Sequence, residues 1–113
     1  LTLFGDGNQS RSFCYVDDLI DGFVRVARLP SLDGPLNLGN PDELSMLELA
    51  REILALTGSR SPLVFSALPA DDPKQRRPDI ARARSLIAFE PRTRLREGLA
   101  QTIEDFAPRV PSA

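Results

Sequence analysis

The sequence has no histidine and only one cysteine, Cys14, among its 113 residues. The lack of histidine excludes Ser-His-Asp and Cys-His catalysis and most zinc sites. A single cysteine cannot form an internal disulfide, and this fits a reducing, cytoplasmic compartment. Apolar runs all fall short of the roughly 18 residues that span a membrane, so no membrane partner is expected.

The chain also lacks an excess of positive charge. The chain has 14 basic and 16 acidic residues, a formal net charge of −2 and a pI of about 5.1. Broad binding to nucleic acid needs a basic face, so we expect no nucleic-acid partner. Hydrophobic residues make up 42% and charged residues 27%, which is ordinary for one folded domain with a modest core. A local basic cluster could still bind a single anionic ligand.

Two glycine-rich phosphate motifs are missing, G-x-G-x-x-G and G-x-x-x-x-G-K-[ST]. The short run "GDGN", residues 5–8, instead predicts a turn. Cys14 lies in an apolar, strand-like stretch, so we predict a buried packing residue rather than a nucleophile. The adjacent acids Asp17 and Asp18 are typical of a helix start, not of an acid–base pair.

Short apolar runs alternate with helical periodicity along the chain. Strands are expected at residues 1–4, 11–16, 35–40 and 62–68, and the first two could form a hairpin. Helices are expected at residues 17–29, 45–58, 79–89 and 95–106. The order β-β-α-β-α-β-α-α indicates a mixed α/β fold in one domain. The helix at 45–58 is the clearest, because Ser45 and Glu48 form a capping box and Gly58 ends it.

Basic residues gather in "DDPKQRRPDI", residues 71–80, between two prolines. Arg76 and Arg77 there, and Arg11 near the second strand, carry guanidinium groups that suit phosphate oxygens. Further polar candidates are Tyr15, Asn37 and Asn40, the last two at a strand end where α/β folds place ligands. The alternative is solvated surface ion pairs, because Asp71, Asp72 and Asp79 are near enough to neutralise the arginines.

Three segments in order resemble one known family: "LTLFGDGNQSRSFCYVDDLIDG", "PLNLGNPDELSMLELA" and "DDPKQRRPDIARARSLIAFEP" followed by "RLREGL". They resemble the carboxyl-terminal third of extended short-chain dehydrogenase/reductases that act on nucleotide sugars. The nearest likeness is to UDP-glucuronate decarboxylases. The dTDP-glucose 4,6-dehydratases and UDP-sugar 4-epimerases share a looser form of the pattern. The resemblance runs from residue 1 to about residue 106.

The resemblance implies a parent enzyme with bound NAD, which oxidises the sugar at C4, releases CO2 from the 4-keto intermediate and reduces the ketone again. Its glycine-rich NAD loop and Tyr-x-x-x-Lys pair would lie in an amino-terminal Rossmann part that this chain lacks. Residues 1–113 are therefore expected to be a single substrate-binding, C-terminal domain fragment, inactive alone and without its own cofactor. A first residue of Leu1 rather than methionine supports that expectation.

The resemblance also assigns roles to single residues. Arg11 matches an arginine that reaches the nucleotide diphosphate of a UDP- or dTDP-sugar. Arg76 matches an arginine that contacts phosphate or sugar and is implicated in the chemistry, which makes it a possible catalytic residue. Tyr15 and Asn40 lie in matching motifs and are further substrate-binding candidates. The parent is expected to be a homodimer, and the exposed strand edges of an incomplete sheet could let the fragment self-associate. A stand-alone, non-enzymatic α/β binding module stays open as an alternative.

Overall fold

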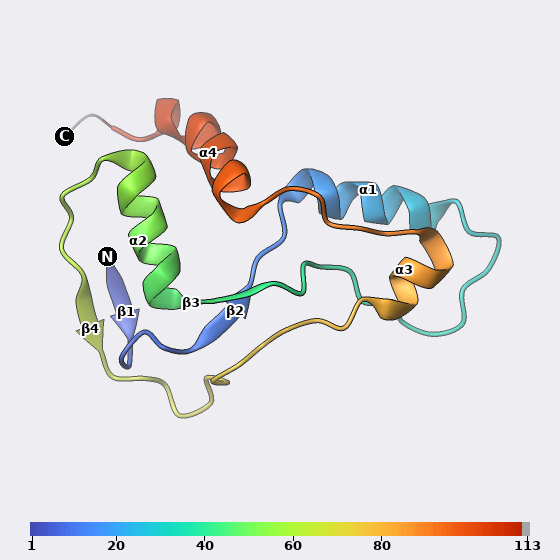
Figure 1. Ribbon diagram of the computed structural model, residues 1–113, viewed down its shortest axis with the longest axis horizontal. Coiled ribbons are helices and arrows are strands. Elements are labelled where there is room, and N and C mark those ends of the chain that lie inside the picture. The colour runs from blue at the N-terminus through green and yellow to red at the C-terminus, as the bar shows by residue number, and fades with distance from the viewer. Residues whose placement is uncertain (112–113) are drawn as a thin grey trace.

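A computed structural model describes residues 1–111 (Figure 1). Its elements are β1 (Thr2–Phe4), β2 (Ser10–Ser12), α1 (Val16–Ala27), β3 (Glu43–Ser45), α2 (Met46–Thr57), β4 (Val64–Ser66), α3 (Ala81–Ile87), α4 (Leu95–Phe106) and the 3-10 turn η1 (Ala107–Arg109). Up to α4 this is the predicted order of strands and helices, and the mixed α/β class is confirmed. No helix of the described part is long and apolar enough to cross a membrane.

The molecule is elongated, with α2, α4, β1 and β4 towards one end and α1 and α3 towards the other (Figure 1). Its radius of gyration is 16.7 Å. A compact domain of this length would have a radius of gyration of about 13 Å. The chain therefore buries less apolar surface than an ordinary domain of its size, and the exposed hydrophobic side chains described below are the consequence.

The strands pair in two separate two-stranded sheets. β1 runs parallel to β4, and β2 runs antiparallel to β3. The predicted hairpin of the first two strands is therefore wrong. The backbone N–H of Asn8 donates to Asp6 Oδ1, and the carbonyl of Gly7 accepts from Leu47 N at the start of α2. The turn thus directs the chain towards α2 instead of folding it back along β1.

The strand predicted at residues 35–40 is also wrong, because the segment is extended but pairs with no strand of the described residues. Buried and exposed side chains do alternate along this segment, since Leu36 and Leu38 are partly buried against the core and Asn37 is exposed. The third strand is instead β3, which pairs with β2. Alternation reports which side chains are buried, but a strand also needs a neighbouring backbone.

The two best-defined helices have the predicted ends. Ser45 Oγ accepts from Glu48 N, Glu48 Oε2 accepts from Ser45 N, and Gly58 takes the left-handed conformation with φ 65°. The bounds of α4 are those predicted. The other two helices start differently. Tyr15 is the N-cap of α1, and Ile80, not Asp79, is the N-cap of α3.

A small apolar core surrounds α3. Its buried members are Ile80, Ala83, Ile87 and Phe89, and partly buried residues of α1 and of residues 29–38 cover it. Gly22 lets α1 approach this core, because a Cβ at that position would lie 2.8 Å from the Phe89 ring. The glycine inside this helix is therefore a packing requirement.

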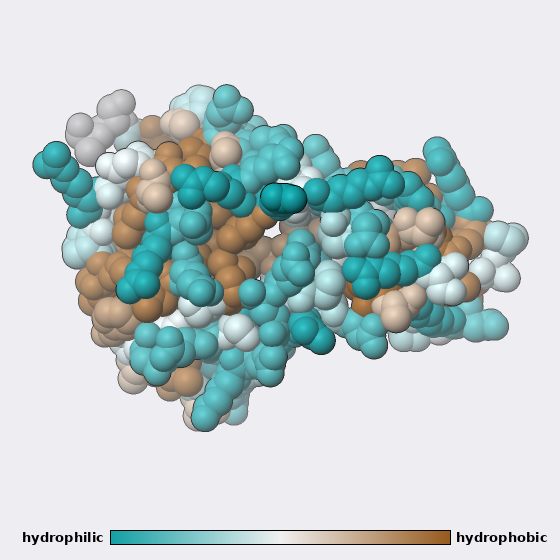
Figure 2. Space-filling view, viewed as in Figure 1, coloured by the Kyte–Doolittle hydropathy of each residue, from teal (hydrophilic) through white to brown (hydrophobic). Residues whose placement is uncertain are grey.

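The helical spacing of apolar residues in α1 predicts one inner face, made of Leu19, Ile20, Phe23, Val24, Val26 and Ala27. Much of that face is exposed, because Ile20, Phe23 and Val24 all keep more than two fifths of their surface accessible. Leu1, Phe4, Val64 and Phe65 on the β1–β4 sheet are similarly exposed. Figure 2 shows apolar surface at the end of the molecule that holds this sheet. The pattern that predicted α1 was correct about helix and wrong about burial.

Candidate functional site

The basic loop, residues 69–78, lies along the edge of β2. Ser10 N donates to Lys74 O at 2.9 Å, and Ser12 Oγ donates to Arg76 O at 3.4 Å. On the far side of the loop, Gln75 Nε2 donates to Glu43 Oε2 at 2.9 Å. Contacts with both β2 and β3 therefore fix a loop that has little apolar burial of its own.

A cavity of about 640 Å³ opens beside this loop. Four segments meet there: the end of β2, one face of α1, the extended residues 36–40 and the end of the basic loop. Its polar wall comprises Arg11, Ser12, Asn37, Asn40, Arg76 and Arg77. Its apolar wall comprises Leu19, Phe23, Leu36, Leu38 and Pro78. A cavity lined by both cations and apolar side chains suits an anion attached to a less polar group.

Three of the four predicted site residues come together here. Arg11, Asn40 and Arg76 line the same cavity although they are far apart in the sequence. Tyr15 lies elsewhere: its hydroxyl donates to Gln101 Oε1 at 3.1 Å and its ring lies against Gly98 of α4. Desolvation, together with the nearby carboxylates, raises the pKa of the Tyr15 phenol. Tyr15 thus joins the start of α1 to α4, and ligand contact from it stays a prediction.

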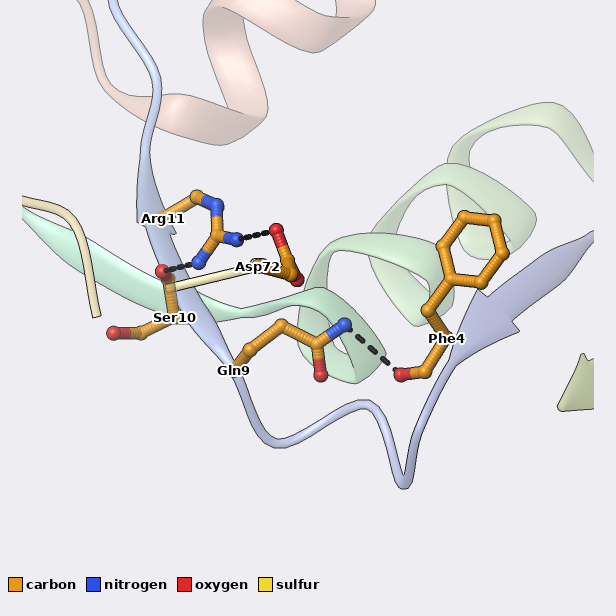
Figure 3. Close-up of polar contacts among 5 residues, drawn as sticks. All are labelled: Phe4, Gln9, Ser10, Arg11 and Asp72. Carbon is orange, nitrogen blue, oxygen red and sulfur yellow. Dashed lines mark hydrogen bonds and ion pairs between the residues drawn. The ribbon is translucent and has the colours of Figure 1, made fainter. Parts of the chain in front are cut away.

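The guanidinium of Arg11 is held on two sides (Figure 3). One terminal nitrogen, Nη2, donates to Asp72 Oδ1 at 2.6 Å, and the other, Nη1, donates to Ser10 O at 2.7 Å. Only 19% of the Arg11 side chain is exposed. The arginine is therefore oriented before any ligand arrives.

Arg76 and Arg77 are exposed, and no carboxylate of residues 1–111 forms an ion pair with either. The surface ion pairs considered as the alternative do not form at these two positions. Asp72 pairs with Arg11, and Asp79 Oδ1 accepts from Ala81 N at the start of α3. The two arginines consequently remain available to an anion.

Asn40 has part of its amide already engaged. Its Oδ1 accepts from Asp42 N at 2.9 Å, which leaves the two hydrogens of the amide nitrogen to donate to a ligand. Next to it, Gly39 lies against Pro78, where a Cβ would come within 3.1 Å of the proline ring. This close approach joins the extended segment to the end of the basic loop and closes that side of the cavity.

Cys14 also lines the cavity, partly buried rather than fully buried as predicted. Burial, with the nearby Asp18 carboxylate, raises the pKa of the Cys14 thiol. The thiol therefore stays protonated near neutral pH, and a protonated thiol is a poor nucleophile. Among residues 1–111, no three histidine, cysteine or acidic side chains gather closely enough to hold a metal ion. The described lining of the cavity thus offers free guanidinium groups and a protonated thiol.

Two features of the site were not predicted. The apolar wall uses Leu19 and Phe23, which the helical pattern had placed in the core, and Phe23 is 54% exposed. The spacing of i and i+4 could have shown that the two share a face, but not what that face contacts. The partnership of Arg11 with Asp72 joins residues 61 positions apart, and no local pattern reports such a pairing.

Comparisons with known proteins give consistent results. The model of the NAD dependent epimerase/dehydratase family matches residues 1–39. UDP-glucuronic acid decarboxylase 1 of Arabidopsis thaliana is 43% identical over 97% of this chain and 25% of its own length. The enzyme of the same name from Danio rerio is 45% identical over 95% of this chain and 25% of its own length.

A crystal structure of UDP-glucuronic acid 4-epimerase from Bacillus cereus, in complex with UDP-glucuronic acid and NAD, shares the fold with a TM-score of 0.86. It is 30% identical, over 96% of this chain and 35% of that one. The chain thus spans about a quarter of the length of these curated relatives and about a third of the solved structure. Over nearly its whole length it is homologous to one portion of these enzymes, as the sequence resemblance predicted.

Proposed function

We propose, starting from this homology, that the chain forms the nucleotide-sugar-binding part of an NAD-dependent nucleotide-sugar enzyme. The observation that carries the proposal is the convergence of Arg11 and Arg76 on one cavity. The two residues come from distant segments, and the second is free of carboxylate partners in the described part of the chain. Guanidinium groups are the side chains best suited to phosphate oxygens.

Different residues of the cavity lining contact different parts of the ligand. The arginines bind the diphosphate, because it carries most of the negative charge of the ligand. The apolar wall with Phe23 offers a surface for a planar base or for the face of a sugar ring. Asn40 contributes an amide donor to a hydroxyl or phosphate oxygen. Arg76 is the more exposed of the two arginines, so we place the sugar, and any catalytic role, on its side of the cavity.

For the parent protein we propose UDP-glucuronate decarboxylation, which yields UDP-xylose and CO2. The curated relatives of similar sequence carry the name of that activity. NAD would supply the oxidation and reduction of the sugar when bound. The residues described here do not fit it: the glycine turn at residues 5–8 leads from β1 towards β2, not into a helix that could face a pyrophosphate. The part of this chain in the reaction is therefore to bind and orient the sugar nucleotide.

A UDP-sugar 4-epimerase is the second candidate, favoured by the similarity in fold to the Bacillus cereus enzyme. Decarboxylase and epimerase would bind the same nucleotide diphosphate, and they differ in what happens to the sugar. This chain's cavity does not contain a group that separates the two, because its titratable members are arginines and Cys14. Identification of the reaction product therefore distinguishes the decarboxylase from the epimerase.

The test uses the longest protein that the surrounding coding sequence encodes. A glycine-rich motif after a strand and a Tyr-x-x-x-Lys motif upstream of Leu1 would support the enzyme; an unrelated domain there would contradict it. Incubated with NAD and UDP-glucuronate, that protein should release CO2 and form UDP-xylose. Formation of an epimer without CO2 would move the assignment to the second candidate, and absence of UDP-sugar binding would overturn the proposal as a whole.

Three further expectations belong to the same proposal. The parent protein works in a reducing cytoplasm, as the single cysteine suggests. It assembles as a homodimer, and the 113-residue chain alone self-associates through its exposed strand edges. Sedimentation of the long protein and of this chain at several concentrations would check both assemblies, since a monomer at every concentration would contradict them.

A further inference from the structure

The ion pair of Arg11 with Asp72 differs from the other ion pairs of the described residues. At 2.6 Å it is the shortest, and its side chains are the least exposed, at 19% and 28%. Each of the other four pairs has at least one side chain that is about half exposed or more. Exposed pairs contribute little because water screens them, whereas a partly buried pair fixes both partners. Arg11–Asp72 is therefore the pair best able to hold a geometry.

Asp72 contacts Arg11 from outside the cavity. Arg11 lines the cavity and Asp72 does not. The carboxylate accepts one hydrogen bond from Nη2, and the carbonyl of Ser10 accepts one from Nη1. A guanidinium has five N–H donors in a rigid fork, so three remain for a ligand. Hydrogen bonds to partners on two different nitrogens restrict the rotation of the Arg11 side chain before a ligand binds. The conformational entropy that a free arginine would lose on binding is therefore already lost.

Asp72 has a second connection to the site, because it lies on the loop that carries Arg76. Its own backbone N–H donates to Pro69 O at 3.2 Å, which fixes the carboxylate within a turn. The ion pair joins this turn to β2, just before the loop contacts β2 again through Lys74 O and Arg76 O. One carboxylate thus sets both the orientation of Arg11 and the position of the loop that presents Arg76.

We propose that Asp72 is a positioning residue for anion binding, which holds the Arg11 guanidinium at the cavity wall and anchors the Arg76 loop beside it. This inference rests on the proposed binding of a nucleotide diphosphate. It predicts an apparent paradox: removal of a negative charge near the site weakens binding of a negatively charged ligand.

The opposite role would be a competitor. In that case Asp72 would occupy Arg11 until the phosphate displaced it, and removal of the carboxylate would strengthen binding. The position of Asp72 outside the cavity, together with the three free donors of Arg11, favours positioning. The sign of the change in affinity separates the two roles.

The experiment measures the affinity for UDP of the longest protein that the surrounding coding sequence encodes, by titration calorimetry, with thermal unfolding of each variant as a check of folding. Asp72→Asn keeps the shape and removes the charge, and we expect about tenfold weaker binding. Asp71→Asn removes the same charge from the exposed neighbouring position and is the matched control, expected within about twofold of the unmodified chain. Asp72→Glu retains the charge and should lie between the unmodified chain and Asp72→Asn.

A double-mutant cycle tests whether Asp72 acts through Arg11. In the Arg11→Ala background, Asp72→Asn should change the affinity for UDP by less than about twofold, because the guanidinium it positions is gone. A further loss as large as in the unmodified chain would overturn the inference, as would unchanged or tighter binding by Asp72→Asn. Affinity of Asp72→Glu equal to that of Asp72→Asn would also contradict it.

Failure of this inference is distinguishable from failure of the proposed function. If the unmodified chain binds UDP and Asp72→Asn binds it equally well, only the positioning role is lost. If the unmodified, folded long protein does not bind UDP, the proposed function fails and the positioning role fails with it.

Discussion

The core around α3 and the basic loop before it are neighbours in the chain, but they are held in place by different forces. The core residues Ile80 and Phe89 are almost completely buried, and their side chains belong to one apolar cluster. Residues 69–78 are mostly exposed and are fixed by polar contacts with β2 and β3. The comparison indicates that stability and ligand binding are separable here: substitutions in the core should unfold the chain, and substitutions in the loop should change binding alone.

The position of the cavity between these two regions explains the division. Pro78, at the end of the loop, lies against Gly39, and the core begins two residues later at Ile80. A rigid apolar cluster therefore supports one end of the loop, while polar contacts set the orientation of its arginines. Preorganised side chains lose less entropy on binding, which is the benefit of supporting a flexible guanidinium in this way.

The largest effect should come from Phe89→Ala. Phe89 is fully buried and its removal leaves a cavity, so the free energy of unfolding should fall by about 3–5 kcal/mol. The matched control is Phe23→Ala, because that ring is 54% exposed and should cost less than about 1 kcal/mol. Chemical denaturation of both variants checks the contrast. Equal losses would show that the core does not dominate stability.

Gly22→Ala should have the next largest effect on stability. The added Cβ would meet the Phe89 ring at 2.8 Å and Leu38 at 3.1 Å, and overpacking of this kind costs about 1–3 kcal/mol. Alanine favours a helix by about 1 kcal/mol over glycine, so at a position without close packing the same substitution would raise the free energy of unfolding. The midpoint of thermal unfolding should fall. A rise would mean that α1 does not pack against the core as described.

Arg76→Ala should weaken UDP binding without changing stability. The side chain is exposed and has no carboxylate partner in residues 1–111, so its removal breaks no contact that supports the fold. Loss of one charge-assisted contact to phosphate should lower affinity about tenfold or more. Arg60→Ala, an exposed arginine outside the cavity, is the control and should bind as the unmodified chain does. Equal affinities of the two variants would contradict the assignment of Arg76.

The smallest effect concerns pH and the ion pair of Arg84 with Glu90. The hydrogen bond from Arg84 lowers the pKa of Glu90 below its ordinary 4.5. A lowered carboxyl pKa contributes stability above pH 4.5, and the contribution is lost as pH falls through the depressed value. Both groups are well exposed, so the effect is small. Glu90→Gln should unfold slightly earlier than the unmodified chain at neutral pH, and the difference should disappear in acid. A difference in unfolding between Glu90→Gln and the unmodified chain that grows in acid would contradict a stabilising effect of the ionised Glu90.

Local signals in the sequence predicted local structure well. The capping box at Ser45 and the spacing from Leu95 to Phe106 gave two helices with accurate ends, because those signals depend only on nearby residues. Strand pairing was not predictable. The alternation of Leu36 and Leu38 correctly predicted that their side chains are buried. A strand also needs a partner backbone, and β2 pairs with β3 rather than with residues 35–40.

The site was predicted in its members but not in its arrangement. Residue type selected Arg11 and Arg76 as anion ligands, and the fold brings both to one cavity with Asn40. Sequence could not show that Tyr15 would be used to join α1 to α4, or that Asp72 would hold Arg11. Contacts of this kind join residues more than 60 positions apart and depend on the tertiary fold.

The central claim is that Arg11 and Arg76 bind one nucleotide diphosphate in the cavity between the basic loop and residues 36–40. The most direct test is a titration with UDP of the longest protein that the surrounding coding sequence encodes, isotopically labelled and followed by NMR at the arginine Nε–H groups and the backbone amides. The account predicts saturable shifts at both arginines and at Ser12, Gly39 and Asn40, with the same dissociation constant for all. Shifts confined to the β1–β4 sheet or to the surroundings of Tyr15, or separate constants for the two arginines, would contradict it.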